Sequence, residues 1–161
     1  MAQDPFRPVD DEARALARSL LDGATYAALA VVQDGAPTVT RIAMATTDRG
    51  TPLSLISDLS THTAALKANP TCALLVGEPK DRGDPLTHPR MTLHATAGFV
   101  DRASPDYPAL RAHYLNLRPK ARLYIDFADF NLVRFDVHSA LLNGGFGKAF
   151  KLTPEDLRRT S

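Results

Sequence analysis

The sequence predicts a mainly antiparallel β protein, built as a small β-barrel with peripheral helices. The first observation is that most of the chain consists of apolar or alternating runs typical of strands, separated by a few short helical segments. The second is that three such runs within residues 25–58 are joined by turns too short for the crossovers that parallel strands require. Closing the resulting sheet into a barrel would hide its edge strands.

The chain begins with an extended arm over residues 1–9, which contains two prolines. A helix is predicted over residues 10–23, because apolar residues recur there at helical spacing, namely Ala13, Leu16, Ala17, Leu20 and Leu21. Asp10 or Asp11 can cap the start of this helix, and Gly23 suits a left-handed cap at its end.

Further strands and helices follow along the chain. Strands are predicted over residues 25–33 and 38–47, and Asp34-Gly35 between them is a strong signal for a hairpin. The next predicted elements are a strand over residues 51–58, a short helix over 60–69 that Pro70 ends, a buried strand over 71–78 and a further strand over 90–101. A helix over 104–117 follows, with Ser104 as cap and Pro105 in its first turn. The last elements are a helical turn over 119–127, a long strand over 130–142 and a terminal helix over 153–161. With no repeat or linker between them, these elements are expected to form one domain spanning residues 1–161.

The composition is that of an ordinary globular protein. Apolar residues make up 44% of the chain and charged residues 23%, and the formal net charge of +1 favours neither a nucleic acid nor an acidic partner. The single cysteine, Cys72, excludes an internal disulfide framework, and its apolar surroundings predict a buried, inert thiol. No apolar run approaches the roughly 20 residues that span a bilayer. Because the acidic start also does not resemble a signal peptide, we expect a cytoplasmic protein without a membrane partner.

Residues 55–70, LISDLSTHTAALKANP, gather hydroxyl side chains where a strand passes into a helix. A helix N-terminus exposes unpaired N–H groups and the positive end of the helix dipole, which together bind anions. Simple helix capping by Ser60 or Thr61 is the alternative explanation. However, one capping hydroxyl leaves the remaining hydroxyls without a role, so the sequence favours a phosphate site at this corner.

Charged residues near this corner strengthen the prediction. Arg41 lies on the strand that we expect to pair with residues 53–58, and Lys67 lies about one turn further into the helix. A cation strengthens the hydrogen bonds that hydroxyl and amide donors make to an anion. Both side chains are therefore candidates for binding a phosphate together with the hydroxyls.

No catalytic or metal-ligating motif is evident. The five histidines have no familiar metal-ligand spacing, and the sequence contains neither a phosphate-binding GxxxxGK[ST] loop nor a GxSxG nucleophile motif. We therefore predict no metal and assign no catalytic residue. Residues 143–150, NGGFGKAF, hold three glycines within four residues, which suits either a tight exit from the last strand or a loop lying against a flat ligand or a partner chain.

Three stretches match a known family in order and spacing: residues 38–78, 83–100 and 143–150, which include TRIAM, STHT, DPLTHPR and GGFG. Over roughly residues 10–152 the sequence resembles the FMN-binding split β-barrel proteins related to pyridoxamine 5′-phosphate oxidase. Within that family it is most similar to the haem-utilisation branch. The resemblance implies a split β-barrel and a homodimer with its cofactor in a cleft at the interface.

The resemblance also implies a cofactor site. In this family the FMN phosphate is held by an arginine on a strand and by polar or basic residues that open the next helix. Carried onto this sequence, the cofactor-binding residues are Arg41, Ala43, Met44, Ser57, His62, Thr63 and Lys67. The backbone of Ala43 and Met44 would run beside the flavin ring. The implied function is an FMN-binding flavoprotein that acts as an oxidoreductase.

Two departures from the family pattern leave other functions open. The arginine-lysine pair that opens the helix in the oxidases matches His62 and Thr63 here, and the tryptophan near their C-terminus has no counterpart in this sequence. Oxidation of pyridoxamine phosphate is therefore not expected. The alternatives are a haem-binding protein with His138 or His88 as axial ligand, and a dimeric binding protein without catalysis.

Overall fold

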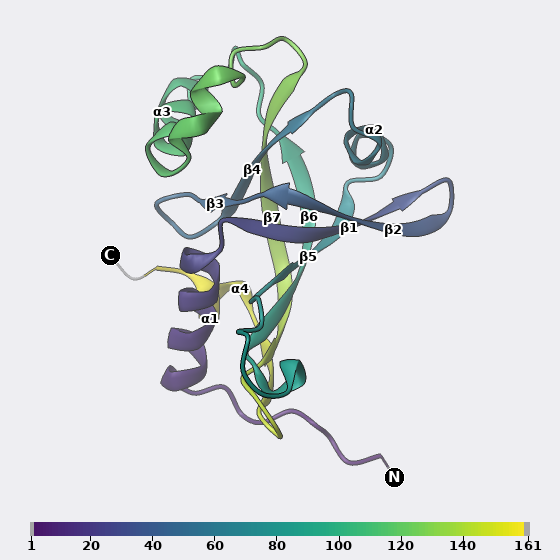
Figure 1. Ribbon diagram of the computed structural model, residues 1–161, viewed down its shortest axis with the longest axis vertical. Helices are drawn as coiled ribbons and strands as arrows, with labels where there is room; N and C mark the ends of the chain where they lie inside the picture. The colour runs from purple at the N-terminus through teal and green to yellow at the C-terminus, as the bar shows by residue number, and fades with distance from the viewer. Residues whose placement is uncertain (1, 160–161) are drawn as a thin grey trace.

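The strand-like runs form an antiparallel sheet that curls into a half-barrel, with helices at its periphery, as predicted (Figure 1). The computed structural model describes residues 2–159. Its strands are β1 Tyr26–Gln33, β2 Ala36–Ala43, β3 Ala45–Thr46, β4 Pro52–Ser57, β5 Thr71–Val76, β6 Arg90–Phe99, β7 Phe130–Asn143 and β8 Ala149–Leu152. Its helices are α1 Asp11–Gly23, α2 Thr61–Ala68, α3 Tyr107–Leu117 and α4 Pro154–Leu157, with 3-10 turns η1 Pro85–Thr87 and η2 Pro119–Leu123. Within residues 2–159, each helix falls short of the length and apolar character needed to cross a bilayer.

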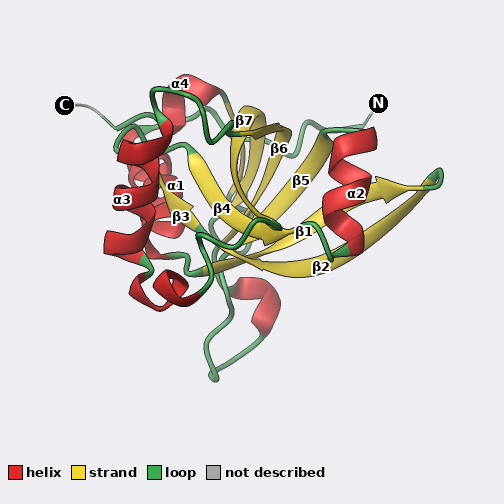
Figure 2. Cartoon of the chain, turned by 90° about the horizontal axis from the view of Figure 1, so that it is seen from above, coloured by secondary structure: helices red, strands yellow, loops and turns green. Residues whose placement is uncertain are grey.

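The order of strands across the sheet corrects one expectation. The order is β2-β1-β5-β6-β7-β4-β3, and β8 also pairs with β7. The strand that contains Arg41 therefore pairs with β1, and not with residues 53–58 as predicted. The predicted strand over residues 38–47 breaks at Met44, so only the two-residue β3 pairs with β4. The curl of the sheet still brings β2 close to β4 (Figure 2), and the Ser54 hydroxyl on β4 donates to the carbonyl of Ala43.

The predicted hairpin between β1 and β2 is confirmed. Asp34 and Gly35 have φ angles of 52° and 78°, so both lie in the left-handed region that a tight two-residue turn between twisted strands requires. Gln33 pairs with Ala36 directly across this turn. Asp34-Gly35 therefore sets the register of the two strands.

A β-bulge interrupts the ladder between β6 and β7. Ala95 pairs with Val137, whereas the adjacent His94 pairs with Ser139, so that His138 is the extra residue on β7. An extra residue shifts the alternation of inward and outward side chains by one position. His138 and Ser139 consequently both lie exposed on the outer face of the sheet.

The first helix begins as predicted but ends differently. The Asp10 carboxylate caps α1 by accepting a hydrogen bond from the N–H of Ala13 at 2.8 Å. Gly23 was predicted to form a left-handed cap, and this is wrong: Gly23 has no positive φ, and Ala24 ends the helix in an extended conformation. An extended residue is needed here because the chain passes directly into β1.

The third helix starts later than predicted. Asp106 precedes α3, whereas Ser104 and Pro105 lie in the turn before it. Asp101 holds that turn, because its carboxylate accepts from the N–H of Ala103 at 2.9 Å and its carbonyl accepts from the N–H of Ser104 at 3.0 Å. Local bonds from an aspartate side chain compete with helix formation in this way.

Buried side chains form two clusters. The larger cluster fills the curl of the sheet, where Phe135 is buried, and packs against α1 and α4. Cys72 belongs to this cluster, and burial raises the pKa of its thiol to about 11, so that the thiol stays protonated at neutral pH as predicted. The smaller cluster, around Tyr114 and Ile125, lies between β4 and the helical segment α3–η2.

The last strand of the sheet, β8, was not predicted from the sequence. The N-terminal arm reaches it through a bridge between Phe6 and Ala149. Residues 143–148 form the tight turn between β7 and β8, which corresponds to the predicted tight exit. The terminal helix is shorter than predicted, since α4 ends at Leu157; residues 160–161 lie outside the described part of the chain.

Candidate functional site

The predicted phosphate corner lies where β4 ends and α2 begins. Here the Ser57 hydroxyl donates to the carboxylate of Asp129 at 2.6 Å and accepts from the N–H of Leu59 at 3.1 Å. The Asp58 N–H in turn donates to the carbonyl of Asp129. The segment before β7 therefore ties down this corner, and a phosphate would compete with a carboxylate for the Ser57 hydroxyl.

Thr63 lies at the same corner but faces the interior. Its side chain is 1% exposed, and its hydroxyl donates to the carbonyl of Ser57 at 2.6 Å. A buried hydroxyl needs such a partner, because burying it without a hydrogen bond would cost free energy. In this structure the Thr63 hydroxyl connects the helix to the end of the strand.

Lys67 pairs with an acid of the same corner. Its ammonium lies 2.8 Å from a carboxylate oxygen of Asp58, which also accepts from the side-chain amide of Asn131 at 2.9 Å. These two hydrogen bonds lower the pKa of Asp58, and the bond from Lys67 has the larger effect. Asp58 is therefore charged at neutral pH, and it offsets the positive charge of Lys67.

Two backbone donors at the start of α2 remain open. In residues 2–159 the N–H groups of Thr61 and His62 have no hydrogen-bond acceptor. The His62 ring is half-buried, and burial lowers its pKa, so the ring is neutral at pH 7. The corner thus presents two amide donors and a neutral imidazole to an anion, beside two carboxylates.

Arg41, Ala43 and Met44 lie in a second group, on β2 and at its end. The guanidinium of Arg41 lies over the ring of Tyr26 at 5.2 Å and forms no hydrogen bond or ion pair within the described chain. The carbonyl of Ala43 accepts from Ser54. The Met44 side chain is buried, and its N–H donates to a carbonyl in the chain before β1.

Arg118, which the sequence did not single out, holds the end of β2 in place. Its Nε donates to the carbonyl of Met44 at 2.9 Å, and one Nη donates to the carbonyl of Ala24 at 2.9 Å. His113 adds a bond to the carbonyl of Thr46 at 2.7 Å. The backbone expected beside the flavin ring is therefore fixed by the helical segment α3–η2.

The histidines differ in the hydrogen bonds that their rings make in the structure. His88 accepts from the N–H of Lys80 at 2.7 Å and meets the carbonyl of Arg82 at 2.6 Å, so both ring nitrogens are engaged. His113 likewise contacts a carbonyl and the carboxylate of Asp48. His88, predicted as a possible axial ligand, instead closes the loop over residues 79–89.

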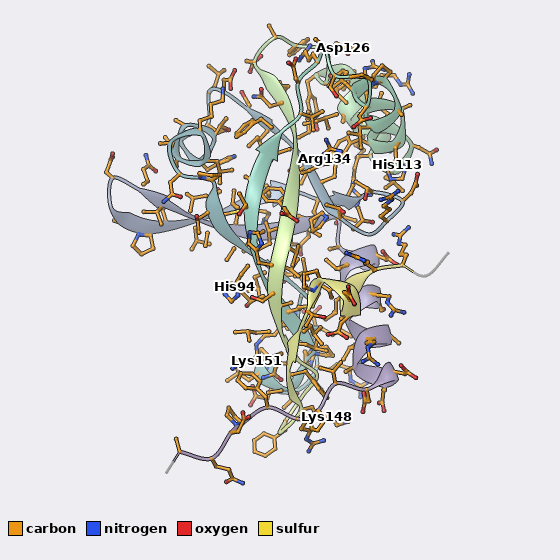
Figure 3. The ribbon with its side chains drawn as sticks, turned by 180° about the vertical axis from the view of Figure 1, so that it is seen from behind. His94, His113, Asp126, Arg134, Lys148 and Lys151 are labelled. Carbon is orange, nitrogen blue, oxygen red and sulfur yellow. The ribbon has the colours of Figure 1, made fainter. Side chains whose placement is uncertain are left out.

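The other predicted haem ligand, His138, lies on the outer face of the sheet, next to the residue that pairs with His94. Figure 3 shows His94 on this face. Nε2 of His138 lies 2.6 Å from the hydroxyl of Thr96. Nδ1 of His94 lies 3.2 Å from the hydroxyl of Ser139, and within residues 2–159 its Nε2 has no partner. With the Nδ1 proton donated to Ser139, the lone pair of Nε2 is available to a metal.

Two rows of side chains cross the outer face around His94. The first row runs across four strands to β7, and its members are Val39, Ala30, Ala73, His94 and Ser139. The second row has mostly apolar residues in its middle and a cation at each end. Its members are Arg41, Ala28, Leu75, Thr92, Leu141 and Lys151. Val39, Leu75 and Leu141 are 67%, 43% and 38% exposed, so this face is an uncovered apolar surface.

Residues 13–142 match the family described as pyridoxamine 5′-phosphate oxidase. The chain belongs to this family. Among curated members, the atypical chloroplastic heme oxygenase HOZ of Arabidopsis thaliana is 34% identical over 137 residues, which are 83% of this chain and 40% of HOZ. A solved heme binding protein from Mycobacterium smegmatis is 26% identical with a TM-score of 0.82, over 93% of this chain and 61% of that protein.

A more distantly related protein of known structure has the same fold. HutZ, a heme storage protein from Vibrio cholerae, is 20% identical with a TM-score of 0.67, over 82% of this chain and 94% of HutZ. The names of HOZ and of the M. smegmatis protein agree with the resemblance to the haem-utilisation branch, whereas HutZ, at 20% identity, shows the fold alone. The chain spans less than two thirds of the length of HOZ and of the M. smegmatis protein.

Sequence reasoning missed several residues of these surfaces. Asp129 and Asn131 act at the corner, yet they lie more than 70 residues from Ser57 and Asp58 in sequence. His94 was treated as one histidine among five, because only the pairing of β6 with β5 and β7 reveals its neighbours. The alternation of apolar and polar residues along β6 was the one available signal for its outward orientation.

Proposed function

We propose that the protein binds haem on the outer face of its sheet, with His94 as the axial ligand. The observation behind the proposal is the free Nε2 of His94, whose ring is oriented by Ser139 through Nδ1. Histidines that bind metals typically donate the N–H of their second ring nitrogen to a hydrogen-bond acceptor, which fixes the tautomer and the ring orientation, and the Ser139 hydroxyl can accept this bond. Haem supplies redox-active iron, and axial ligation by the protein tunes it.

The residues around His94 suit a flat apolar ligand with carboxylates. Ala73, next to His94 across the strands, is small, and Leu75 and Leu141 offer exposed apolar contact. Lys151, whose ammonium lies 4.5 Å from the centre of the Phe6 ring, lies at the end of the same face and can pair with a haem carboxylate (Figure 3). The names of HOZ, the M. smegmatis protein and HutZ add support, because each refers to haem.

Titration with haemin tests this proposal. The wild-type protein should develop a sharp Soret band, and His94→Ala should lower haem affinity by about tenfold or more and change the band, because the ligand to iron is lost. His88→Ala is the matched control, since both of its ring nitrogens are engaged in the loop. A His94→Ala spectrum identical to that of the wild type would refute His94 as the ligand.

We also propose FMN as a second candidate cofactor, with its phosphate at the start of α2. The specific support is the pair of open N–H groups at Thr61 and His62, together with membership of a family whose members bind flavin. Arg41, with no acidic partner in the described chain, is the candidate cation on β2. A bound flavin would supply the redox chemistry of an oxidoreductase.

Thr61→Pro is a sharp test of FMN binding. Proline is tolerated at the first position of a helix, so this change removes one phosphate donor without breaking α2. Quenching of FMN fluorescence should show weaker binding for Thr61→Pro and for Arg41→Ala than for the wild type. Equal affinity in all three proteins would remove both residues from the phosphate site, whereas a Soret band without any FMN binding would leave haem as the cofactor.

We further propose that two copies associate through the outer face, so that the cofactor lies at their interface. The exposed Val39 and Leu75 on this face are the support, because monomeric proteins rarely leave such a surface open. Val39→Glu should shift sedimentation from dimer to monomer. Leu123→Glu, the control, changes an even more exposed apolar residue, on η2, and should leave the dimer intact. A monomeric wild type would refute the proposal.

A further inference from the structure

A cavity of the described chain lies away from the outer face and from the corner at α2, at the point where β7 lacks a neighbouring strand on one side. β4 pairs with β7 up to Arg134, and β8 pairs with it from Ala140 onward. On that side, residues 135–139 therefore have no strand beside them. A cavity of about 790 Å³ opens here, between the turn of residues 48–52 and the segment that follows α4.

The floor of this cavity is apolar. It is formed by residues of α1, β7 and α4, of which Leu21, Phe135 and Leu157 are buried and Val137 is half-buried. Its volume lies within the range of small-molecule sites in proteins, roughly 300–1,000 Å³. The floor could therefore cover one face of a ring system.

The rim is cationic. Arg49, Arg158 and Arg159 line the cavity, against the two carboxylates of Asp48 and Asp136. Arg159 is held in place by Asp22 and by the Thr46 hydroxyl at 3.0 Å.

The other two arginines are available to a ligand. Within residues 2–159, Arg49 has no hydrogen-bond or ion-pair partner, and Arg158 has only Glu155 at 3.9 Å. Of the two acids, Asp48 already faces His113 at 3.3 Å. An anion entering the cavity would therefore meet two uncommitted guanidinium groups, which pair well with carboxylate, sulfonate and phosphate groups.

We propose that this cavity binds a small aromatic acid, with the ring on the apolar floor and the anionic group between Arg49 and Arg158. The two features complement each other, because a purely polar anion would not use the floor and a neutral ring would leave both arginines unpaired. The site shares no residue with the two rows around His94 or with the corner at α2, so it stands independently of haem and FMN binding.

Anilinonaphthalene sulfonate, which combines an aromatic body with one anionic group and fluoresces when bound, is the probe for the test. The double variant Arg49→Ala/Arg158→Ala should bind it about tenfold or more weakly than the wild type, because both charged partners are lost. Val137→Trp should also reduce binding by filling the cavity. Arg122→Ala, which removes an exposed arginine on η2, is the matched control and should leave the affinity unchanged.

Two further measurements keep the outcome unambiguous. Circular dichroism melting confirms that each variant is folded, and Leu75→Ser reports on dye bound to the outer face. Unchanged affinity in both the double variant and Val137→Trp would overturn the proposal. So would loss of dye binding in Leu75→Ser alone, because the dye would then be on the outer face.

Discussion

Gly77→Ala should be the most destabilising of the glycine-to-alanine substitutions in the described chain. Gly77 follows β5 with a φ of +100°, a conformation that residues with a Cβ rarely adopt. A Cβ at this position would lie 2.5 Å from the carbonyl oxygen of Pro89 and 2.8 Å from the Cα of Arg90. Both atoms belong to backbone at the start of β6, so neither can move without disturbing the sheet. We expect the free energy of unfolding to fall by about 3 kcal/mol or more.

Gly83→Ala is the matched control for this prediction. Gly83 lies in the same loop with a φ of +74°, but a Cβ there would meet no atom within 4 Å. It should therefore cost only the conformational penalty, about 1–2 kcal/mol. Urea unfolding of the two variants measures both values, and equal losses of stability would contradict the role assigned to the contact with Pro89.

Arg118→Ala should produce the second largest loss. The guanidinium donates to the carbonyls of Met44 and Ala24, the two places where the chain leaves β2 and enters β1. Hydrogen bonds from a charged donor contribute about 1.5–3 kcal/mol, and their removal leaves partly buried acceptors without a partner. We expect the free energy of unfolding to fall by about 3 kcal/mol, with the largest increase in amide hydrogen exchange at β3.

Arg118→Lys separates charge from geometry. Lysine keeps the charge but cannot reach two carbonyls with a planar fork, so it should recover only part of the lost stability. Arg122→Ala, on the exposed side of the adjacent η2, should change stability by no more than about 0.5 kcal/mol. Full recovery by lysine would show that the two specific hydrogen bonds do not matter.

Much of this fold could be predicted from local pattern alone. The α1 helix, the Asp34-Gly35 hairpin and the long strand β7 are each specified by spacing or turn chemistry within a few residues. The partner of β2 could not be predicted in this way. Strand pairing depends on how the whole sheet curls. The break at Met44 depends on a distant residue, since Arg118 donates to the carbonyl of Met44.

The same distinction applies to the candidate site, of which local sequence could predict one part but not the other. The corner of α2 could be located from sequence because a strand, a run of hydroxyls and a helix follow one another directly. Its charge balance could not, since Asp129 and Asn131 arrive from the far end of the chain. His94 is the clearest case, because its significance depends on Ser139, which reaches it only through the bulge in β7.

That bulge also decides where β7 can tolerate a change in length. On either side of it, inward-facing residues occupy opposite phases of the two-residue repeat: the half-buried Val137 comes before it and the buried Ala140 after it. Deleting His138 would join the two phases into one regular strand and keep both halves of the core in place. A deletion outside the bulge, with the bulge retained, would instead move the inward-facing residues of one half of the strand to the outer face. Natural relatives that differ in length within this strand are therefore expected to differ at the bulge.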